Sequence, residues 1–233
     1  MEVEIEHDLR DLFGPARDQG ARPTCMAFAA SDAHAAVRVG WEPLSCEFAY
    51  YHALQIDGGE PHEGATAYGM LKAIKSEGQP PETVWEYLPQ IPADKTAWKP
   101  PANATPLYKR ASAHDSASLP AIKELLGAGC PVIITMSLSD GFYVPDGDGV
   151  IAVEEPPDST RHHAVVAVGY GTRGSERMYL VRNSWGIMWG IDGYAWISEG
   201  YLAPRLSGFA ELKEDLTNVS ANKTAEIVRS GMG

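Results

Sequence analysis

Apolar residues recur at helical spacing through the first third of the chain. An alanine-rich segment runs from Ala27 to Val39 and stops at Gly40. Two further segments carry an apolar residue every three or four positions, which is typical of one face of an amphipathic helix. Their apolar positions are Phe48, Tyr51 and Leu54 in one and Tyr68, Leu71 and Ile74 in the other. The pattern predicts three helices that each turn these positions toward a core.

Residues 79–106 interrupt this pattern with seven prolines. Proline lacks a backbone N–H group and restricts the residue before it, so neither a regular helix nor a sheet strand is expected here. The segment also carries Trp85, Tyr87 and Trp98. We predict a long ordered loop that its aromatic side chains pack and that crosses between two lobes.

Past about residue 115 the spacing changes toward that of strands. Ser118 and Pro120 favour the start of a short helix that ends at Gly127 and Gly129. Short β-branched and apolar runs follow, separated by turn residues. The predicted strands are 131–136, 150–151, 162–168 and 178–182, with a turn at 146–149. Together the patterns predict an α+β fold with a helical first part and a β-rich second part.

Length and charge narrow the class of protein. With 233 residues and 44% hydrophobic residues the chain fits a single domain with a substantial core. A net charge of −12 argues against nucleic acid or an anionic membrane as a partner. The N-terminus has no signal-peptide pattern, and no apolar run approaches the ~18–20 residues of a membrane-spanning helix.

Cys25 stands where a polar turn runs into the alanine-rich helix. Thr24 is expected to cap the first turn with its hydroxyl, and the helix start favours thiolate over thiol. Gln19 is expected to lay its side-chain amide beside the sulfur, where it and the Cys25 N–H group can stabilise an oxyanion. The alternative is a small buried residue chosen for packing.

Two distant motifs favour the catalytic interpretation. Residues 163–171 begin His-Ala-Val and end Gly-Tyr-Gly, and residues 183–186 are Asn-Ser-Trp-Gly. If the two strands are antiparallel neighbours, Asn183 lies beside His163 and accepts from one ring nitrogen while the other nitrogen faces the sulfur. Trp185 would then cover this hydrogen bond from water. A simple turn is the alternative for the second motif.

Gln19, Cys25, His163 and Asn183 occur in the order found in the papain-like cysteine peptidases, cathepsins included, and the motifs around them resemble that family. The resemblance spans residues 8–215, nearly the whole chain. It implies a thiol protease that hydrolyses peptide bonds through an acyl-thioester, with a protein or peptide as substrate and no cofactor.

The resemblance also implies an architecture for the single domain 1–233. A mainly helical lobe, 8–115, and a β-rich lobe, 116–215, would enclose an active-site cleft, and 216–233 would form a C-terminal tail. Four residues would contact the substrate in that cleft: Gly64, Ala65, Ala164 and Trp185. A plain helix start is the alternative for the first two.

Other functions remain open for the same residues. A peptide ligase or transpeptidase would use the same site, and a non-catalytic peptide-binding module could share the fold. All four catalytic positions are filled, which favours hydrolysis. Met26 stands where the family usually has an aromatic residue, and residues 22–24 are Arg-Pro-Thr. Substrate preference therefore does not transfer from well-known members.

The number and placement of the cysteines indicate the cellular compartment of the protein. The chain has only Cys25, Cys46 and Cys130. Secreted members of the family usually carry several disulfides, one of them from a cysteine where this chain has Arg22. We expect Cys46 and Cys130 to be reduced and buried, which indicates a cytoplasmic protein.

Metal binding and the control of activity are two further questions. Adjacent residues His162 and His163 point to opposite faces of a strand, so we expect no metal site. Only about 24 residues precede Cys25, too few for the pro-segment typical of the family. We expect activity without maturation, restrained by narrow substrate choice, by a regulatory protein partner or by the tail 217–233.

Overall fold

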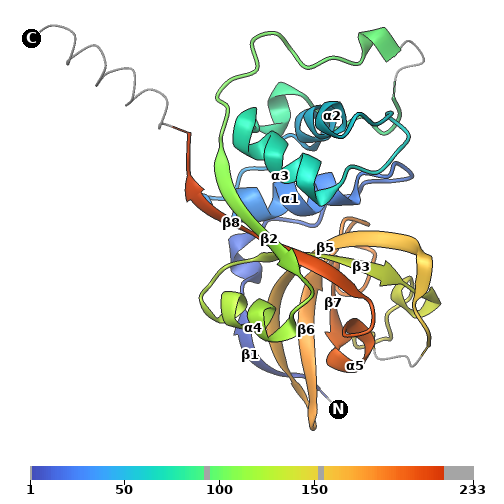
Figure 1. The fold of residues 1–233 in the computed structure, drawn as a ribbon. Helices are drawn as coiled ribbons and strands as arrows, with labels where there is room; N and C mark the ends of the chain where they lie inside the picture. The colour runs from blue at the N-terminus through green and yellow to red at the C-terminus, as the bar shows by residue number, and fades with distance from the viewer. Residues whose placement is uncertain (1, 92–94, 152–154, 218–233) are drawn as a thin grey trace, which may run out of the picture.

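The computed structural model describes residues 2–91, 95–151 and 155–217. Its helices are α1 (Cys25–Ala36), α2 (Cys46–Asp57), α3 (Ala67–Ser76), α4 (Leu119–Gly127) and α5 (Glu199–Leu202). Its strands are β1 (Glu4–Asp8), β2 (Arg110–Ser116), β3 (Val132–Leu138), β4 (Val150–Ile151), β5 (Asp158–Arg173), β6 (Glu176–Arg182), β7 (Tyr194–Ser198) and β8 (Leu206–Asp215). Figure 1 shows α1, α2 and α3 gathered in an upper lobe and most of the strands in a lower one.

One mixed sheet organises the lower lobe. Its strand order is β2-β8-β3-β5-β6-β7-β4, with β1 paired to the far half of β5. All pairs are antiparallel except β4 with β7. β3 and the middle of β5 are buried on both faces, which explains why their sequences are mostly apolar. The expected two-lobed α+β architecture is confirmed.

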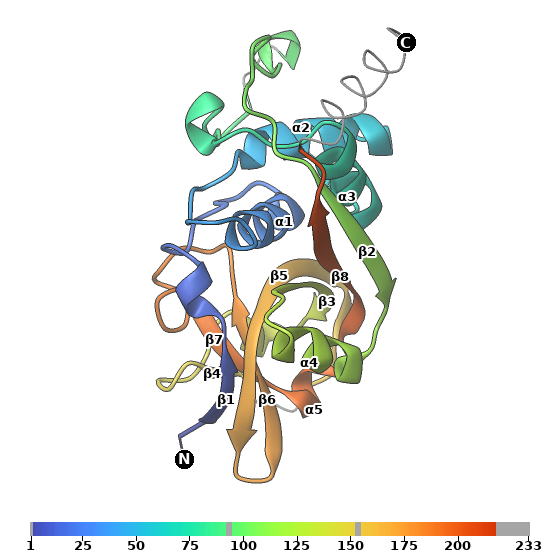
Figure 2. The same cartoon turned by 90° about the vertical axis from the view of Figure 1, so that its left-hand side faces the viewer.

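Helix α1 lies between the helices α2 and α3 and the sheet (Figure 2). It packs against β5 on one side and against α2 and α3 on the other. Every residue of α1 except Cys25 is buried, so its alanine-rich composition follows from close packing on all sides. The first residue of this central helix therefore opens onto the boundary between the lobes.

Local sequence signals account for most helix ends. The Ser45 hydroxyl accepts from the Phe48 N–H at the start of α2, and Gly58 ends that helix with a left-handed backbone (φ 68°). The Ser118 hydroxyl accepts from the Ala121 N–H at the start of α4, with proline in the first turn as predicted.

Several expectations were wrong in detail. Helix α1 ends at Ala36, before the predicted Val39, and β5 begins at Asp158, before the predicted His162. Tyr68 is 66% exposed rather than in the core. Its helix α3 is only ten residues long and buries a narrow stripe that leaves Tyr68 outside.

The proline-rich segment forms a loop, as predicted, with single 3-10 turns at Glu82–Val84 and Lys95–Ala97. Trp98 is buried in the core, and Trp85 and Tyr87 are packed against it. The segment leads into β2, which pairs with β8 and runs between the lobes in Figure 1. Residues 92–94 and 218–233, including nearly all of the predicted tail, lie outside the described residues.

Candidate active site

Cys25 is the first residue of α1 and is half-buried. Thr24 occupies the N-cap position, but its side chain makes no capping hydrogen bond, contrary to the expectation. Its hydroxyl lies 2.9 Å from the hydroxyl of Tyr87 instead. A residue of the proline-rich loop therefore binds the Thr24 hydroxyl, which the sequence predicted would cap the helix.

Burial raises the pKa of the Cys25 thiol. The backbone N–H groups of Ala164 in β5 and of Met26 and Cys25 at the helix start act in the opposite direction, but they are the weaker effect. The resting site therefore favours the neutral thiol. This corrects the expectation of a stable thiolate, and it makes proton transfer to a neighbouring base part of any attack.

His163 lies in β5, and its Nε2 is 2.7 Å from Oδ1 of Asn183. An amide oxygen only accepts, so Nε2 carries the proton and Nδ1 is left as an acceptor in the neutral ring. Burial lowers the pKa of His163 to about 4, against the opposing effect of the Asn183 hydrogen bond. The ring packs on Trp185 at 4.8 Å and on Phe142 at 5.7 Å between centroids.

Sheet register explains why His163 and Asn183 meet. β5 and β6 are antiparallel neighbours, with Val166 opposite Arg182. Asn183 follows the end of β6, and its Oδ1 also accepts from the N–H of Ser184 at 2.8 Å. This second donor fixes the orientation of the amide. The predicted hydrogen bond is thus present, with Trp185 packed against the ring as expected.

Gln19 is held by hydrogen bonds to both its backbone and its side chain. Its backbone N–H donates to the carbonyl of Ser184 (2.8 Å), and its Nε2 donates to the carbonyl of Arg22 (2.8 Å). The Ser184 hydroxyl donates to Oε1 at 2.6 Å. The side chain is only 6% exposed. One of the two Nε2 hydrogens remains for another acceptor.

A cleft of about 810 Å³ runs between the lobes and collects these residues. Gln19, Cys25 and His163 line it, together with all four expected substrate contacts, Gly64, Ala65, Ala164 and Trp185. Asn183 lies behind His163 and is buried. The structure therefore brings all eight sequence-predicted residues to one place.

The cleft also has walls that the sequence did not indicate. They come from β3, from the loop after it, from the first part of β5 and from the start of β8. The additional residues include Thr135, Met136, Leu138, Tyr143, Arg161 and Ser207. They carry no motif, and only the pairing of β3 with β5 and β8 brings them to the cleft.

Arg182 was also missed. Its guanidinium is buried and donates to Asp32 (2.7 Å), to the hydroxyl of Tyr194 (2.6 Å) and to the carbonyls of Gly14 and Pro15. Asp32 lies in α1, the helix that Cys25 opens, and Arg182 directly precedes Asn183. This ion pair thus ties the two lobes together just behind the site.

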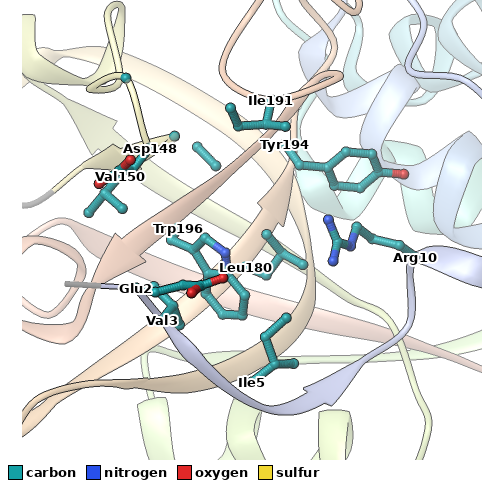
Figure 3. Close-up of a pocket in the computed structure, with 13 residues that line it drawn as sticks. Glu2, Val3, Ile5, Arg10, Asp148, Val150, Leu180, Ile191, Tyr194 and Trp196 are labelled. Carbon is teal, nitrogen blue, oxygen red and sulfur yellow. The ribbon is translucent and has the colours of Figure 1, made fainter.

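A second hollow, of about 510 Å³, lies apart from this cleft (Figure 3). Its lining includes Ile5 and Arg10 on one side and Ile191, Tyr194 and Trp196 on the other. None of the predicted site residues lines it. Its one guanidinium, that of Arg10, is paired with Asp8. Its lining contains no cysteine or histidine, so it is not a candidate site for the predicted chemistry.

Within the described residues, no group of three or more His, Cys, Asp or Glu side chains is placed to hold a metal ion. All three cysteines are free. Cys46 is buried as expected, whereas Cys130 is only half-buried, because it follows the end of α4 rather than lying within an element. In the part of the chain that the structure describes, no helix is long and apolar enough to cross a membrane.

The sequence matches the family described as "Papain family cysteine protease" over residues 5–207. A cysteine protease of Blomia tropicalis is 34% identical over 79 residues, 34% of this chain and 24% of that protein. A cathepsin L-like proteinase of Fasciola hepatica is 28% identical over 190 residues, 76% of this chain and 54% of that protein. The chain thus spans about a quarter of the first relative and about half of the second.

Solved structures show the same fold. Xylellain, a cysteine protease from Xylella fastidiosa, superposes with a TM-score of 0.69 at 24% identity, over 91% of this chain and 86% of that one. Digestive procathepsin L 3 of Tenebrio molitor gives 0.71 at 19% identity, over 89% and 69%. The family match covers most of the sequence, including each predicted catalytic residue. The chain belongs to the papain family of cysteine proteases.

Proposed function

We propose that the protein is a cysteine endopeptidase that hydrolyses peptide bonds through Cys25, His163 and Asn183. One observation carries the proposal. The hydrogen bond between His163 and Asn183 leaves Nδ1 of the neutral ring as an acceptor, and His163 and Cys25 line the same cleft. A nucleophile, a base and a group that orients the base are the parts that acyl transfer requires.

The first half-reaction forms an acyl-enzyme. Both Cys25 and His163 favour their neutral forms at rest, so the thiol proton passes to Nδ1 of His163 as sulfur attacks the peptide carbonyl. The oxyanion accepts hydrogen bonds from the Cys25 backbone N–H and from the remaining Nε2 hydrogen of Gln19. His163 then protonates the leaving amine, and the C–N bond breaks.

The second half-reaction releases the acid product. His163 takes a proton from water, which attacks the thioester carbonyl. The C–S bond then breaks, and His163 passes the proton to the sulfur to return the thiol and the neutral ring. Asn183 holds the ring in one orientation through both halves, because its oxygen is itself held by the N–H of Ser184. Gly64 and Ala65 lie on the wall where an extended peptide would pair with backbone groups.

Labelling by a peptidyl epoxide tests this proposal. We expect one equivalent to react, with peptide mapping placing the label on Cys25. Cys46 is an internal control, because burial raises the pKa of its thiol well above the usual range. Cys25→Ala should abolish hydrolysis while leaving the melting temperature nearly unchanged. A label on Cys46 or Cys130 would contradict the assignment.

Product masses decide between hydrolysis and its alternatives. A hydrolase yields two fragments whose masses sum to the substrate plus one water. A ligase or transpeptidase, given a second amine, yields a joined product instead. A peptide-binding module leaves the substrate intact. We expect the fragments of hydrolysis, with protein or peptide chains as substrates.

We also propose that the enzyme works in a reducing compartment such as the cytoplasm. The proposal is supported by the three free cysteines, since disulfides are typical of secreted members. Localisation of the full-length tagged protein in its own cells would test it. Recovery from the secreted fraction would overturn it.

A further inference from the structure

A buried ion pair lies beside the cleft and has no part in the mechanism above. The guanidinium of Arg22 donates to both carboxylate oxygens of Glu47, Nη1 at 2.7 Å and Nη2 at 3.0 Å. Arg22 is 8% exposed and Glu47 is fully buried. The two hydrogen bonds fix the relative orientation of the side chains as well as stabilising the pair. Removing one partner would leave the other charge buried and unpaired, which is strongly destabilising.

The Glu47 carboxylate also accepts two hydrogen bonds from the proline-rich loop. It accepts from the indole Nε1 of Trp98 at 2.6 Å and from the backbone N–H of Leu88 at 3.0 Å. Arg22 returns a bond to the Leu88 carbonyl at 2.5 Å. Helix α2, the loop after residue 79 and the turn before the nucleophile therefore meet at one ion pair.

From there the contacts lead to the expected oxyanion donors. The Arg22 guanidinium lies 5.0 Å from the ring centroid of Tyr87. The hydroxyl of Tyr87 donates to the backbone carbonyl of Gln19 at 2.7 Å and lies 2.9 Å from the hydroxyl of Thr24. The carbonyl of Arg22 itself accepts from Nε2 of Gln19. Residues 19–24 are thus held at both ends by this cluster.

A second aromatic contact of the guanidinium leads to the expected substrate wall. Arg22 lies 5.3 Å from the ring centroid of Tyr50. The hydroxyl of Tyr50 is within hydrogen-bonding distance of the carbonyls of Pro61 and Glu63. Glu63 directly precedes Gly64, so the same cluster supports the strip that lines the cleft.

We propose that Arg22 and Glu47 are positioning residues for this reaction, which hold residues 19–24 so that Gln19 can donate to the oxyanion. The inference rests on the proposed peptidase function. It requires that the ion pair act through Gln19 rather than through overall stability. A misplacement of about 1 Å at a reacting group can lower a rate by about 10²-fold, so the effect should be measurable.

A double-mutant cycle tests that requirement. Glu47→Gln keeps the shape of the side chain but removes its charge, and we expect kcat to fall about 10-fold with little change in KM. In a Gln19→Ala background the same change should lower kcat by less than about 2-fold, because the group that it positions is already gone. An equal loss in both backgrounds would overturn the proposal.

Two controls separate positioning from folding. Gln79→Met removes hydrogen bonds to the buried side chains of Ser31 and His34 and to the carbonyl of Ser45 but none to Arg22 or Glu47, and it should lower the melting temperature but not kcat. Alkylation of Cys25 by iodoacetamide builds no oxyanion, so its rate in Glu47→Gln should stay within about 2-fold of wild type. A parallel loss of alkylation would mean a general collapse of the site and would contradict the proposal.

Should Glu47→Gln fail to fold, Tyr87→Phe decides the question. It removes only the hydroxyl that holds Gln19 and Thr24, and we expect kcat to fall about 5-fold, again only when Gln19 is present. An unchanged kcat in Tyr87→Phe would overturn the positioning role of the cluster but not the proposed peptidase function. A wild-type protein that cleaves no peptide would instead overturn the proposed function, and this inference with it.

Discussion

The hydroxyl of Ser184 donates a 2.6 Å hydrogen bond to the side-chain oxygen of Gln19, a residue 165 positions earlier in the chain. This bond decides which end of the amide faces which neighbour. With Oε1 held by Ser184, Nε2 is left to donate. The motif that contains Asn183 therefore orients the proposed oxyanion donor as well as the histidine.

Replacing Gln19 by alanine tests this arrangement. We expect kcat to fall by about 10²–10³-fold with little change in KM, as for the loss of one oxyanion donor. Steady-state kinetics on a peptide substrate would measure both constants. A change confined to KM would show that Gln19 binds the substrate rather than stabilising the transition state.

Asn183→Ala should remove the hydrogen bond that orients the His163 ring while leaving the ring in place as the base. General acid–base catalysis contributes about 10²–10⁴-fold, and a misoriented base loses part of that, so we expect kcat/KM to fall by about 10–100-fold. The Nδ2 group of Asn183 has no hydrogen-bond partner in the structure, which limits the effect on stability. A variant with wild-type kcat/KM would exclude Asn183 from the mechanism.

Asp32 pairs with the buried Arg182 and with the partly buried Arg17. Burial alone would raise its pKa, but the Arg17 and Arg182 guanidinium groups hold the pKa of Asp32 below its usual value. Asp32→Asn leaves Arg182 without a counter-charge and Arg17 with Glu82 alone, and we expect the free energy of unfolding to fall by about 3–5 kcal/mol. Urea denaturation would measure it.

Asp8→Asn is the matched control for that change. Asp8 pairs with Arg10 at the surface, where an ion pair contributes at most about 1 kcal/mol. Equal effects of the two substitutions would show that the buried network contributes no more than a surface pair.

Stability should fall as the pH drops from about 6.5 toward about 4. Burial lowers the pKa of His34 to about 4, against a hydrogen bond to Gln79, and burial does the same for His163. In this window the unfolded chain binds protons that the folded protein excludes. Each histidine then contributes about 1.4 kcal/mol of destabilisation per pH unit.

His34→Gln removes one of these two titrating histidines, so it measures the contribution of His34 to the pH dependence of stability. The amide can still donate to Gln79 but does not titrate, so the slope of unfolding free energy against pH should decrease by about one proton between pH 6.5 and 4. Urea denaturation at several pH values would measure the slope. An unchanged slope would mean that His34 is protonated in the folded protein.

Reducing agent should affect activity but not folding. All three cysteines are free, so reductant should leave the melting temperature unchanged. Mild oxidation should inactivate the enzyme at Cys25, and reductant should restore activity. A melting temperature several degrees lower in reductant would reveal a disulfide.

Sequence alone was sufficient for the features that local chemistry determines. The start of α4 at Ser118 and Pro120, the apolar run of β3 and the order of Gln19, Cys25, His163 and Asn183 all follow from short stretches of chain. Caps, periodicity and motifs act within a few residues, so they are visible before folding.

The tertiary structure determined the features that depend on residues far apart in the chain. Thr24 bonds to Tyr87 rather than capping its own helix, and the Cys25 thiol has a raised pKa because burial outweighs the helix start. Asp32 pairs with Arg182 across 150 positions. Hydrogen bonding, burial and ion pairing act over a few ångströms in space. Only the packing of segments far apart in the chain determines which groups come that close.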